Sequence, residues 1–167
     1  MIHVYTGNGK GKTTAAFGLA LRALGAGRKV YITQFAKGVR SAEAKAILQL
    51  KNARITHCGS KCFIKKKPSQ QDIDRARKGF NRMIKETKKR NYDVILLDEI
   101  NIALSLKLLN LSNVITFINE YTKKSEIILT GRSAPKKLIQ LADYVTEMKD
   151  VKHPFRKGIV ARKGIEL

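Results

Sequence analysis

Short runs of apolar residues recur along the chain and are separated by longer segments in which apolar positions have a helical spacing. Several runs are apolar at nearly every position and rich in β-branched residues, a pattern typical of parallel strands that are buried on both faces. The runs predict strands over residues 2–6, 29–36, 53–57, 92–99, 125–131 and 143–148.

The segments between the runs predict helices. Residues 13–27 are apolar nearly all round, as expected of a helix buried against a sheet, and Gly25 and Gly27 are stop signals at its end. A longer helix is predicted to begin after Ser69, an N-cap with Asp72 at the capping-box position, and to carry one apolar stripe and a basic opposite face. Shorter helices are expected over 41–51, over 100–109 and on through 112–121, and over 134–142.

Strands that alternate with helices indicate an α/β fold, because each helix returns the chain across a face of the sheet to begin the next parallel strand. The crossover of the first strand–helix–strand unit should be right-handed. The length of 167 residues predicts one domain with one substantial core, covering residues 1–167.

A glycine-rich loop, GNGKGKTT, follows the first strand without a linker. Its glycines allow φ > 0 and a close approach of the backbone to an anion. The helix that begins at about Thr13 points unpaired N–H groups and its positive dipole end at the loop. Lys12 adds a full charge, and the Thr13 hydroxyl is placed to bind a Mg²⁺ ion on a phosphate. Nucleotide phosphates are therefore predicted to bind at Gly7, Asn8, Gly9, Lys10, Gly11, Lys12, Thr13 and Thr14.

The loop departs at one position from the common P-loop pattern, G-x-x-x-x-G-K-[ST]. Counting back from Gly11 puts Thr6, not glycine, at the first place of the pattern. The nearest glycine, Gly7, makes the loop one residue tighter. The departure suggests that a bound triphosphate lies differently from that in an ordinary kinase.

A second informative stretch is the apolar run 92–99, which ends in Asp98 and Glu99. In a parallel sheet this acidic end emerges at the same edge as the glycine-rich loop, where a carboxylate can hold Mg²⁺ directly or through water. The alternative is that the acidic pair caps the helix that follows. Arg132, just after the run 125–131, either reaches the nucleotide phosphates or lies on the surface.

The formal net charge of +21 implies affinity for polyanions, and nucleic acid is the first candidate. The basic residues are scattered in pairs and triplets, and the aromatic residues, 7% of the chain, are not interleaved with them as a stacking surface requires. We therefore expect a solvated basic surface rather than a nucleic-acid groove. No stretch is apolar enough for a membrane span and no secretory signal precedes the first strand, so a cytoplasmic protein is expected. Cys58 and Cys62 are expected to be reduced thiols.

A family resemblance extends over essentially the whole chain. It is carried by VYTGNGKGKTTAAFGLALRALG, QFAKG, VILLDEINIAL and the C-terminal stretch that begins with ILTGRSAPKK. Together these look like the P-loop class of ATP:corrinoid adenosyltransferases, which transfer the 5′-deoxyadenosyl group of ATP to the Co(I) of a corrinoid and release triphosphate. The resemblance implies a P-loop NTPase-like (RecA-like) fold, a mostly parallel sheet with helices on both faces. It also implies ATP bound in reverse in the tight loop, with Mg²⁺.

By this resemblance, Lys12, Thr13 and Glu99 are the catalytic residues. Thr13 and Glu99 would hold Mg²⁺, Asp98 would support them without binding the metal directly, and Arg132 would complete the ATP-binding set. Many relatives have aromatic residues that press on the lower face of the corrin ring, and Phe63 in GSKCFIKKK would do so here.

The resemblance also concerns partners. The family is typically homodimeric, and many relatives cover the active site with an N-terminal segment. This chain begins at the first strand, so a partner subunit is expected to supply the cover. An acidic, flavodoxin-like reductant of the corrinoid would be steered to the basic surface.

Two other functions remain open at this stage. A small-molecule P-loop kinase should have an arginine-bearing lid and an acceptor site, and the sequence offers no clear lid. An ATP-dependent nucleic-acid-binding protein is suggested by the charge, and it would bind DNA or RNA in a salt-sensitive manner.

Overall fold

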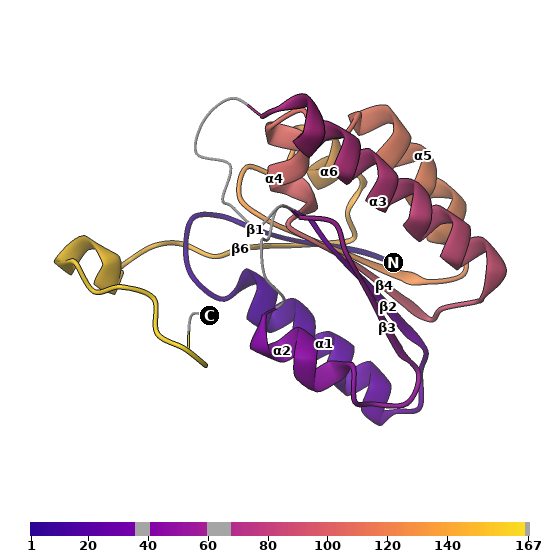
Figure 1. Cartoon of the computed structure of the whole chain (residues 1–167), viewed down its shortest axis with the longest axis horizontal. Coiled ribbons are helices and arrows are strands. Elements are labelled where there is room, and N and C mark those ends of the chain that lie inside the picture. Colours follow the sequence, from indigo (N-terminus) through magenta and orange to yellow (C-terminus); the bar gives the residue numbers. More distant parts are fainter. Residues whose placement is uncertain (36–40, 60–67, 166–167) are drawn as a thin grey trace.

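The computed structural model describes residues 1–35, 41–59 and 68–165, which form a six-stranded parallel sheet with helices on both faces (Figure 1). The strand order is β3-β2-β4-β5-β1-β6. Each strand lies within a run that the sequence predicts as a strand, so the predicted α/β fold is confirmed. The strands are β1 (Ile2–Thr6), β2 (Val30–Gln34), β3 (Ala53–His57), β4 (Val94–Asp98), β5 (Glu126–Thr130) and β6 (Tyr144–Glu147).

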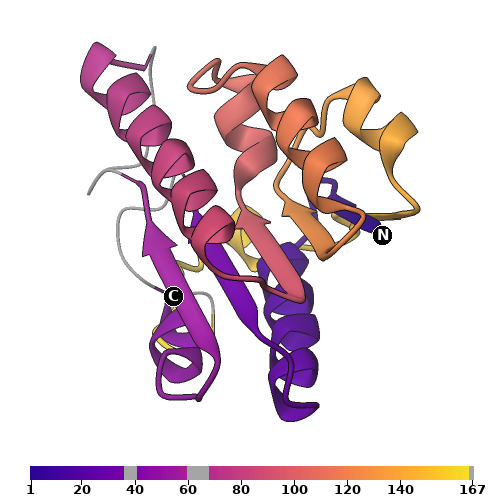
Figure 2. The same ribbon diagram turned by 90° about the vertical axis from the view of Figure 1, so that its right-hand side faces the viewer.

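Helices α1 and α2 cover one face of the sheet, and α3 to α6 cover the other, as the two views in Figures 1 and 2 show. Because every strand points the same way, the loops at the carboxyl ends of the strands all lie at one edge of the sheet. The helices are α1 (Lys12–Gly25), α2 (Ala42–Ile47), α3 (Gln70–Lys89), α4 (Ile100–Ser105), α5 (Leu111–Tyr121) and α6 (Lys136–Leu141).

An apolar core lies on each side of the sheet, and β4 contributes to both. Val94 and Leu96 pack with the residues of α1 and α2, whereas Ile95 and Leu97 pack with those of α3 to α6. Neither face of β4 meets water, which is why this run is apolar at every position instead of alternating.

The start of the long helix is confirmed. The Ser69 hydroxyl accepts from the Asp72 N–H at 3.2 Å, and the Asp72 carboxylate accepts from the Ser69 N–H at 3.0 Å. These two bonds form a capping box, which satisfies N–H groups that the first turn of α3 leaves without helical partners.

The prediction that one helix continues from residue 100 to residue 121 is wrong, because the structure has two separate helices there. α4 ends at Ser105, Lys107 has a φ of 57°, and α5 begins after Asn110. The Asn110 side chain accepts from the Ser112 N–H at 3.0 Å. Asparagine favours this N-cap over a position inside a helix, because its side chain competes for backbone hydrogen bonds.

After β6 the chain leaves the sheet as a tail that extends to one side of the molecule, with a 3₁₀ helix, η1 (Pro154–Lys157) (Figure 1). The tail carries exposed apolar side chains, among them Val151, Phe155 and Val160. None of the helices within the described ranges has the length and apolar character needed to cross a membrane.

Candidate active site

The glycine-rich loop connects the end of β1 to the start of α1 at the carboxyl edge of the sheet. Thr6, which stands where the common pattern has glycine, is still a residue of β1. The turn is made by Gly7, with a φ of 92°, and Gly11, with a φ of 115°, precedes α1. Both values lie in the left-handed region, which glycine adopts without a steric penalty. The tight spacing therefore results from β1 extending through the first place of the pattern.

Gly9 has a different role, because its φ does not lie in the left-handed region. A Cβ on Gly9 would lie 2.6 Å from the Lys149 carbonyl oxygen and 2.7 Å from that of Met148. The expected φ > 0 is thus found at Gly7 and Gly11 but not at Gly9. A glycine is needed there because another backbone segment passes against the loop.

That segment, residues 148–149, is called here the β6 extension. The Met148 N–H donates to the Thr6 carbonyl at 2.9 Å, and the Gly9 N–H donates to the Met148 carbonyl at 2.7 Å. The Met148 sulfur lies 3.2 Å from where a Cβ on Gly11 would be. The loop is therefore braced by a segment from the other end of the chain.

Lys12 is a buried cation inside the loop, with 8% of its surface exposed. Its Nζ donates to the Gly9 carbonyl at 2.6 Å. Burial lowers the pKa of the Lys12 ammonium, Glu99 opposes this shift, and Arg132 adds to it. The structure thus brings Lys12, Glu99 and Arg132 within electrostatic reach of one another, although Arg132 itself is exposed. The other predicted loop residues, Asn8, Lys10 and Thr14, are exposed as well.

Asp98 is fully buried at the end of β4, and its carboxylate accepts hydrogen bonds from three side chains. Oδ1 accepts from the hydroxyl of Thr13 at 3.0 Å and from that of Thr130 at 2.8 Å. Oδ2 accepts from the Gln34 side-chain amide at 3.0 Å. Hydrogen bonds of this kind are what allow a carboxylate to remain buried. The loop residue Thr13 is therefore joined directly to Asp98.

Glu99 follows Asp98 in a left-handed conformation, with a φ of 61°. Its backbone N–H donates to the Thr130 hydroxyl at 2.9 Å. Although Glu99 precedes α4, its side chain makes no capping hydrogen bond to the described residues of that helix. Glu99 therefore takes the N-cap position of α4, as the alternative interpretation of the acidic pair expects, but its side chain does not make the cap. The Glu99 carboxylate lies beside Gly131, where a Cβ would come within 3.1 Å of its Oε2.

Several residues that contribute to this site are not predicted from the sequence. Gln34 and Thr130 bind Asp98, and the Asn101 side chain donates to the Gly131 carbonyl at 3.0 Å. Gln34 and Thr130 share one signal that could have revealed them, because each is a buried polar residue at the end of an apolar strand. The β6 extension has no such signal.

The donor set fits a Mg²⁺ ion that is bound together with a phosphate. Mg²⁺ prefers oxygen ligands and commonly takes only one or two carboxylates alongside phosphates and water. The hydroxyl of Thr13 and the carboxylate of Asp98 are in contact, and Glu99 follows in the chain. Across the described ranges, no group of three or more His, Cys, Asp or Glu side chains forms a metal cage. The residues present therefore suit a metal–nucleotide site.

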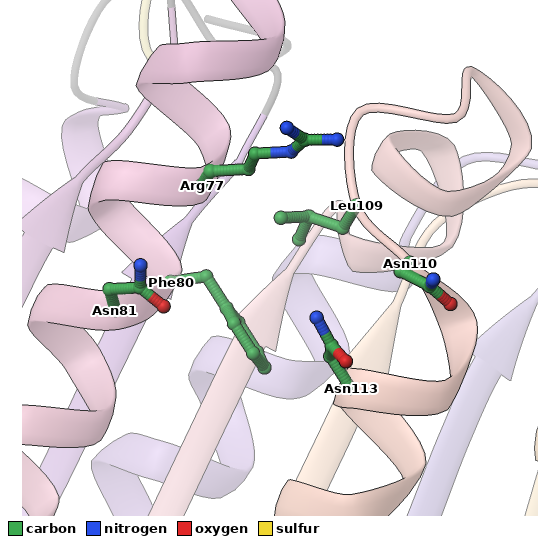
Figure 3. A pocket seen from close by; sticks show the side chains of 6 residues that line it. All are labelled: Arg77, Phe80, Asn81, Leu109, Asn110 and Asn113. Carbon is green, nitrogen blue, oxygen red and sulfur yellow. The ribbon is translucent and has the colours of Figure 1, made fainter.

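A separate cavity of about 310 Å³ opens between α3 and α5 (Figure 3). Two buried apolar side chains and four polar ones line it, and none belongs to the glycine-rich loop: Arg77, Phe80, Asn81, Leu109, Asn110 and Asn113.

The predicted corrin contact, Phe63, lies outside the described residues.

The sequence matches known proteins along its full length. The family model described as ATP:corrinoid adenosyltransferase BtuR/CobO/CobP matches residues 1–167. A corrinoid adenosyltransferase of Pseudomonas aeruginosa is 36% identical over 165 residues, which cover 98% of this chain and 81% of the relative. A corrinoid adenosyltransferase of Escherichia coli K12 is 34% identical over 166 residues, which cover 99% of this chain and 85% of the relative. A corrinoid adenosyltransferase of a Sinorhizobium species is 34% identical over 176 aligned positions, which cover 99% of this chain and 79% of the relative.

Proposed function

The chain belongs to the ATP:corrinoid adenosyltransferase family, and we propose that it transfers the 5′-deoxyadenosyl group of ATP to a corrinoid while the glycine-rich loop holds the leaving triphosphate. The main support is the gathering of Lys12, Glu99 and Arg132 beside a loop whose Thr13 is bonded to Asp98. Cations and a metal-binding set beside one loop suit a polyanionic leaving group.

The proposed reaction is a displacement at carbon. The Co(I) of the corrinoid forms a bond to C5′ of ATP, the C5′–O bond breaks, and its electron pair departs with the triphosphate. Cobalt supplies the electron pair of the new bond, so the step needs no general base. The protein has to align the reacting atoms and to stabilise the charge that grows on the triphosphate oxygen.

Lys12 and the loop backbone are proposed to stabilise that charge. The Lys12 ammonium already lies inside the loop, bonded to the Gly9 carbonyl, and a triphosphate oxygen is a stronger acceptor than a carbonyl. The Gly9 N–H is engaged by Met148, so the other N–H groups of residues 7–13 are the proposed backbone donors. Arg132 is exposed and is proposed to bind the triphosphate from the solvent side.

Thr13 and Glu99 are the proposed Mg²⁺ ligands, with Asp98 holding Thr13 in place. The Thr13 hydroxyl donates its proton to Asp98, and a hydroxyl oxygen that donates its proton can still act as a metal ligand. When bound, Mg²⁺ would neutralise part of the triphosphate charge.

The remaining proposals follow from family resemblance. Phe63 is proposed to press on the lower face of the corrin ring, and the protein is proposed to act as a homodimer. An acidic, flavodoxin-like protein is the proposed electron donor that forms Co(I), because the chain carries a formal charge of +21. The cytoplasm is the proposed location, because ATP and reducing power are available there.

The two competing functions are not favoured. A small-molecule kinase and an ATP-dependent nucleic-acid-binding protein would each share the P-loop, but the family match extends over residues 1–167 and the named relatives are corrinoid adenosyltransferases.

The test is to incubate the protein with Mg-ATP and a chemically reduced corrinoid. We expect the absorption spectrum of an adenosylated corrinoid and the release of intact triphosphate. A reaction without corrinoid is the control, and it should leave ATP intact. ADP or orthophosphate as the only product would contradict the proposal.

A further inference from the structure

Thr130, the last residue of β5, joins Asp98, the last residue of β4, to Glu99, which follows it, through a single hydroxyl group. This hydroxyl donates to Asp98 Oδ1 at 2.8 Å and accepts from the Glu99 backbone N–H at 2.9 Å. Thr130 is fully buried, so water does not compete for either bond. One side chain therefore fixes both carboxylate-bearing residues from the neighbouring strand.

The bond to Glu99 matters because the conformation of that residue is strained. A left-handed φ such as the 61° of Glu99 is sterically unfavourable for a residue with a side chain, because Cβ comes close to the following carbonyl oxygen. Such a conformation persists only where the surrounding structure enforces it. The Thr130 hydroxyl does so by accepting a backbone N–H for which the first turn of α4 offers no acceptor.

The strained turn sets the direction of the Glu99 side chain. Its carboxylate lies beside Gly131 and acts electrostatically on Lys12 instead of capping α4. Asn101 fixes the same turn from the other side, by donating to the Gly131 carbonyl. Two hydrogen bonds, one at Thr130 and one at Gly131, therefore join the end of β5 to the turn that carries Glu99.

We propose that Thr130 is a positioning residue for adenosyl transfer, which holds Asp98 against Thr13 and Glu99 towards Lys12. Its role in transfer rests on the proposed function, whereas its role in preparing the site for a metal-bound triphosphate does not. Valine has nearly the shape of threonine and can make neither bond, while serine can make both. The two substitutions at Thr130 therefore separate hydrogen bonding from packing.

The experiment compares Thr130→Val and Thr130→Ser with the wild type and with Thr87→Val. Thr87 is the matched control, because it is also buried and its hydroxyl donates a bifurcated hydrogen bond to the Met83 and Ile84 carbonyls of α3, at 3.0 Å each. The readouts are kcat, the KM for corrinoid, the thermal midpoint, and the calorimetric affinity for inorganic tripolyphosphate with and without Mg²⁺.

We expect Thr130→Val to lower kcat about 10–100-fold and to weaken Mg²⁺-dependent tripolyphosphate binding about tenfold, the range typical when a group that orients metal ligands is removed. The KM for corrinoid should stay unchanged. The kcat and the tripolyphosphate affinity of Thr130→Ser should remain within about twofold of the wild-type values. The same is expected of Thr87→Val, although its thermal midpoint should be lower. In a double-mutant cycle, Thr130→Val and Glu99→Gln should be less than additive, because both act on the same carboxylate.

Wild-type kcat and tripolyphosphate affinity in a folded Thr130→Val variant would overturn the inference. Equal losses in Thr87→Val would also overturn it, because they would reduce the effect to general destabilisation. A wild type that forms no adenosylated corrinoid would refute the proposed function alone. Thr130 would then be judged by tripolyphosphate binding, and an unchanged affinity in Thr130→Val would still overturn its positioning role.

Discussion

Lys12 is a cation that folding has partly removed from water before any substrate binds. Burial lowers the pKa of its ammonium, and the nearby Glu99 carboxylate opposes the shift. A cation with few surrounding water molecules interacts more strongly with an anion than one in bulk solvent does. This environment is consistent with the proposed role of Lys12, which is to stabilise charge on a leaving triphosphate.

Replacing Lys12 by alanine should therefore lower kcat by about 10²–10³-fold, the range seen when one group that stabilises a growing oxyanion is removed. Adenosylcorrinoid formation under saturating Mg-ATP measures this effect. Lys51→Ala is a suitable control, because Lys51 is an exposed residue of a turn remote in sequence from the loop. A rate for Lys12→Ala close to that of the wild type would remove the residue from the mechanism.

Cys58 illustrates the opposite case, a reactive group that folding makes inert. Burial raises the pKa of its thiol to about 12, from about 9.0, and Arg82 opposes the shift only partly. The thiolate is the reactive form. In a Cys62→Ser variant, a thiolate-directed reagent at pH 8 should modify Cys58 at least 100-fold more slowly in the folded protein than in urea. Similar rates in the two states would contradict this assignment.

The same shift predicts how Cys58 affects stability. Between pH 9 and pH 12 the thiol loses its proton in the unfolded chain but keeps it in the folded one. The folded state then binds more protons, so the contribution of Cys58 to the free energy of unfolding falls as the pH rises above about 9. Urea unfolding at pH 8 and pH 10 should show a smaller decline for Cys58→Ala than for the wild type.

At the scale of secondary-structure elements, two helical glycines differ in their surroundings. A Cβ on Gly79 of α3 would overlap the Cys58 sulfur, whereas a Cβ on Gly18 of α1 would meet nothing within 4 Å. The close contact means that α3 can pack beside the end of β3 only with glycine at that position. Local helix propensity would favour alanine at both sites equally.

Gly18→Ala should raise the free energy of unfolding by about 1 kcal/mol through helix propensity. Gly79→Ala should instead lower it by up to about 2 kcal/mol, because an overpacking cost of about 1–3 kcal/mol exceeds the same gain of about 1 kcal/mol. Urea unfolding of the two variants measures both values under identical conditions. A stabilised Gly79→Ala would show that α3 can move away from Cys58 at little cost.

The β6 extension shows how one element shapes another that is far away in sequence. Its backbone pairs with Thr6 and Gly9, so the glycine-rich loop also continues the pairing of β1 with β6. The glycine at position 9 is explained by this pairing and not by the loop conformation alone. The sequence of the loop alone cannot predict this pairing, because the pairing segment lies about 140 residues further along the chain.

At the scale of the whole molecule, the formal charge of +21 acts over distance instead of at one site. Scattered lysines and arginines raise the rate at which an acidic partner arrives, and salt suppresses this effect over a Debye length of about 10 Å at 0.1 M. The charge would therefore affect the encounter with an acidic protein partner more than the proposed displacement step.

If an acidic, flavodoxin-like protein supplies the electrons, the turnover rate should fall at least tenfold between low and physiological ionic strength. Turnover with a chemically reduced corrinoid is the matched control, and it should change little because no protein has to dock. Donor-dependent rates that are insensitive to salt would exclude electrostatic steering. The measurement needs only the two assays in parallel over a series of salt concentrations.

Much of the fold follows from local signals in the sequence. Apolar periodicity distinguishes strands from helices, Ser69 and Asp72 mark the start of α3, and the position of the glycine-rich loop after β1 places that loop at the carboxyl edge of the sheet. Each signal acts over a few residues, which is why reading along the chain recovers it. The paired acidic residues at the end of β4 are recovered for the same reason.

The partners of those residues are decided by the order of the strands. Because β5 lies between β1 and β4, Thr130 comes beside Asp98 and Glu99, and because β6 lies beside β1, Met148 reaches Gly9. Periodicity makes a run a strand but does not say which strand is its neighbour. The loop and the carboxylates can thus be predicted from the sequence, whereas the contacts that hold them in working positions depend on packing between distant segments.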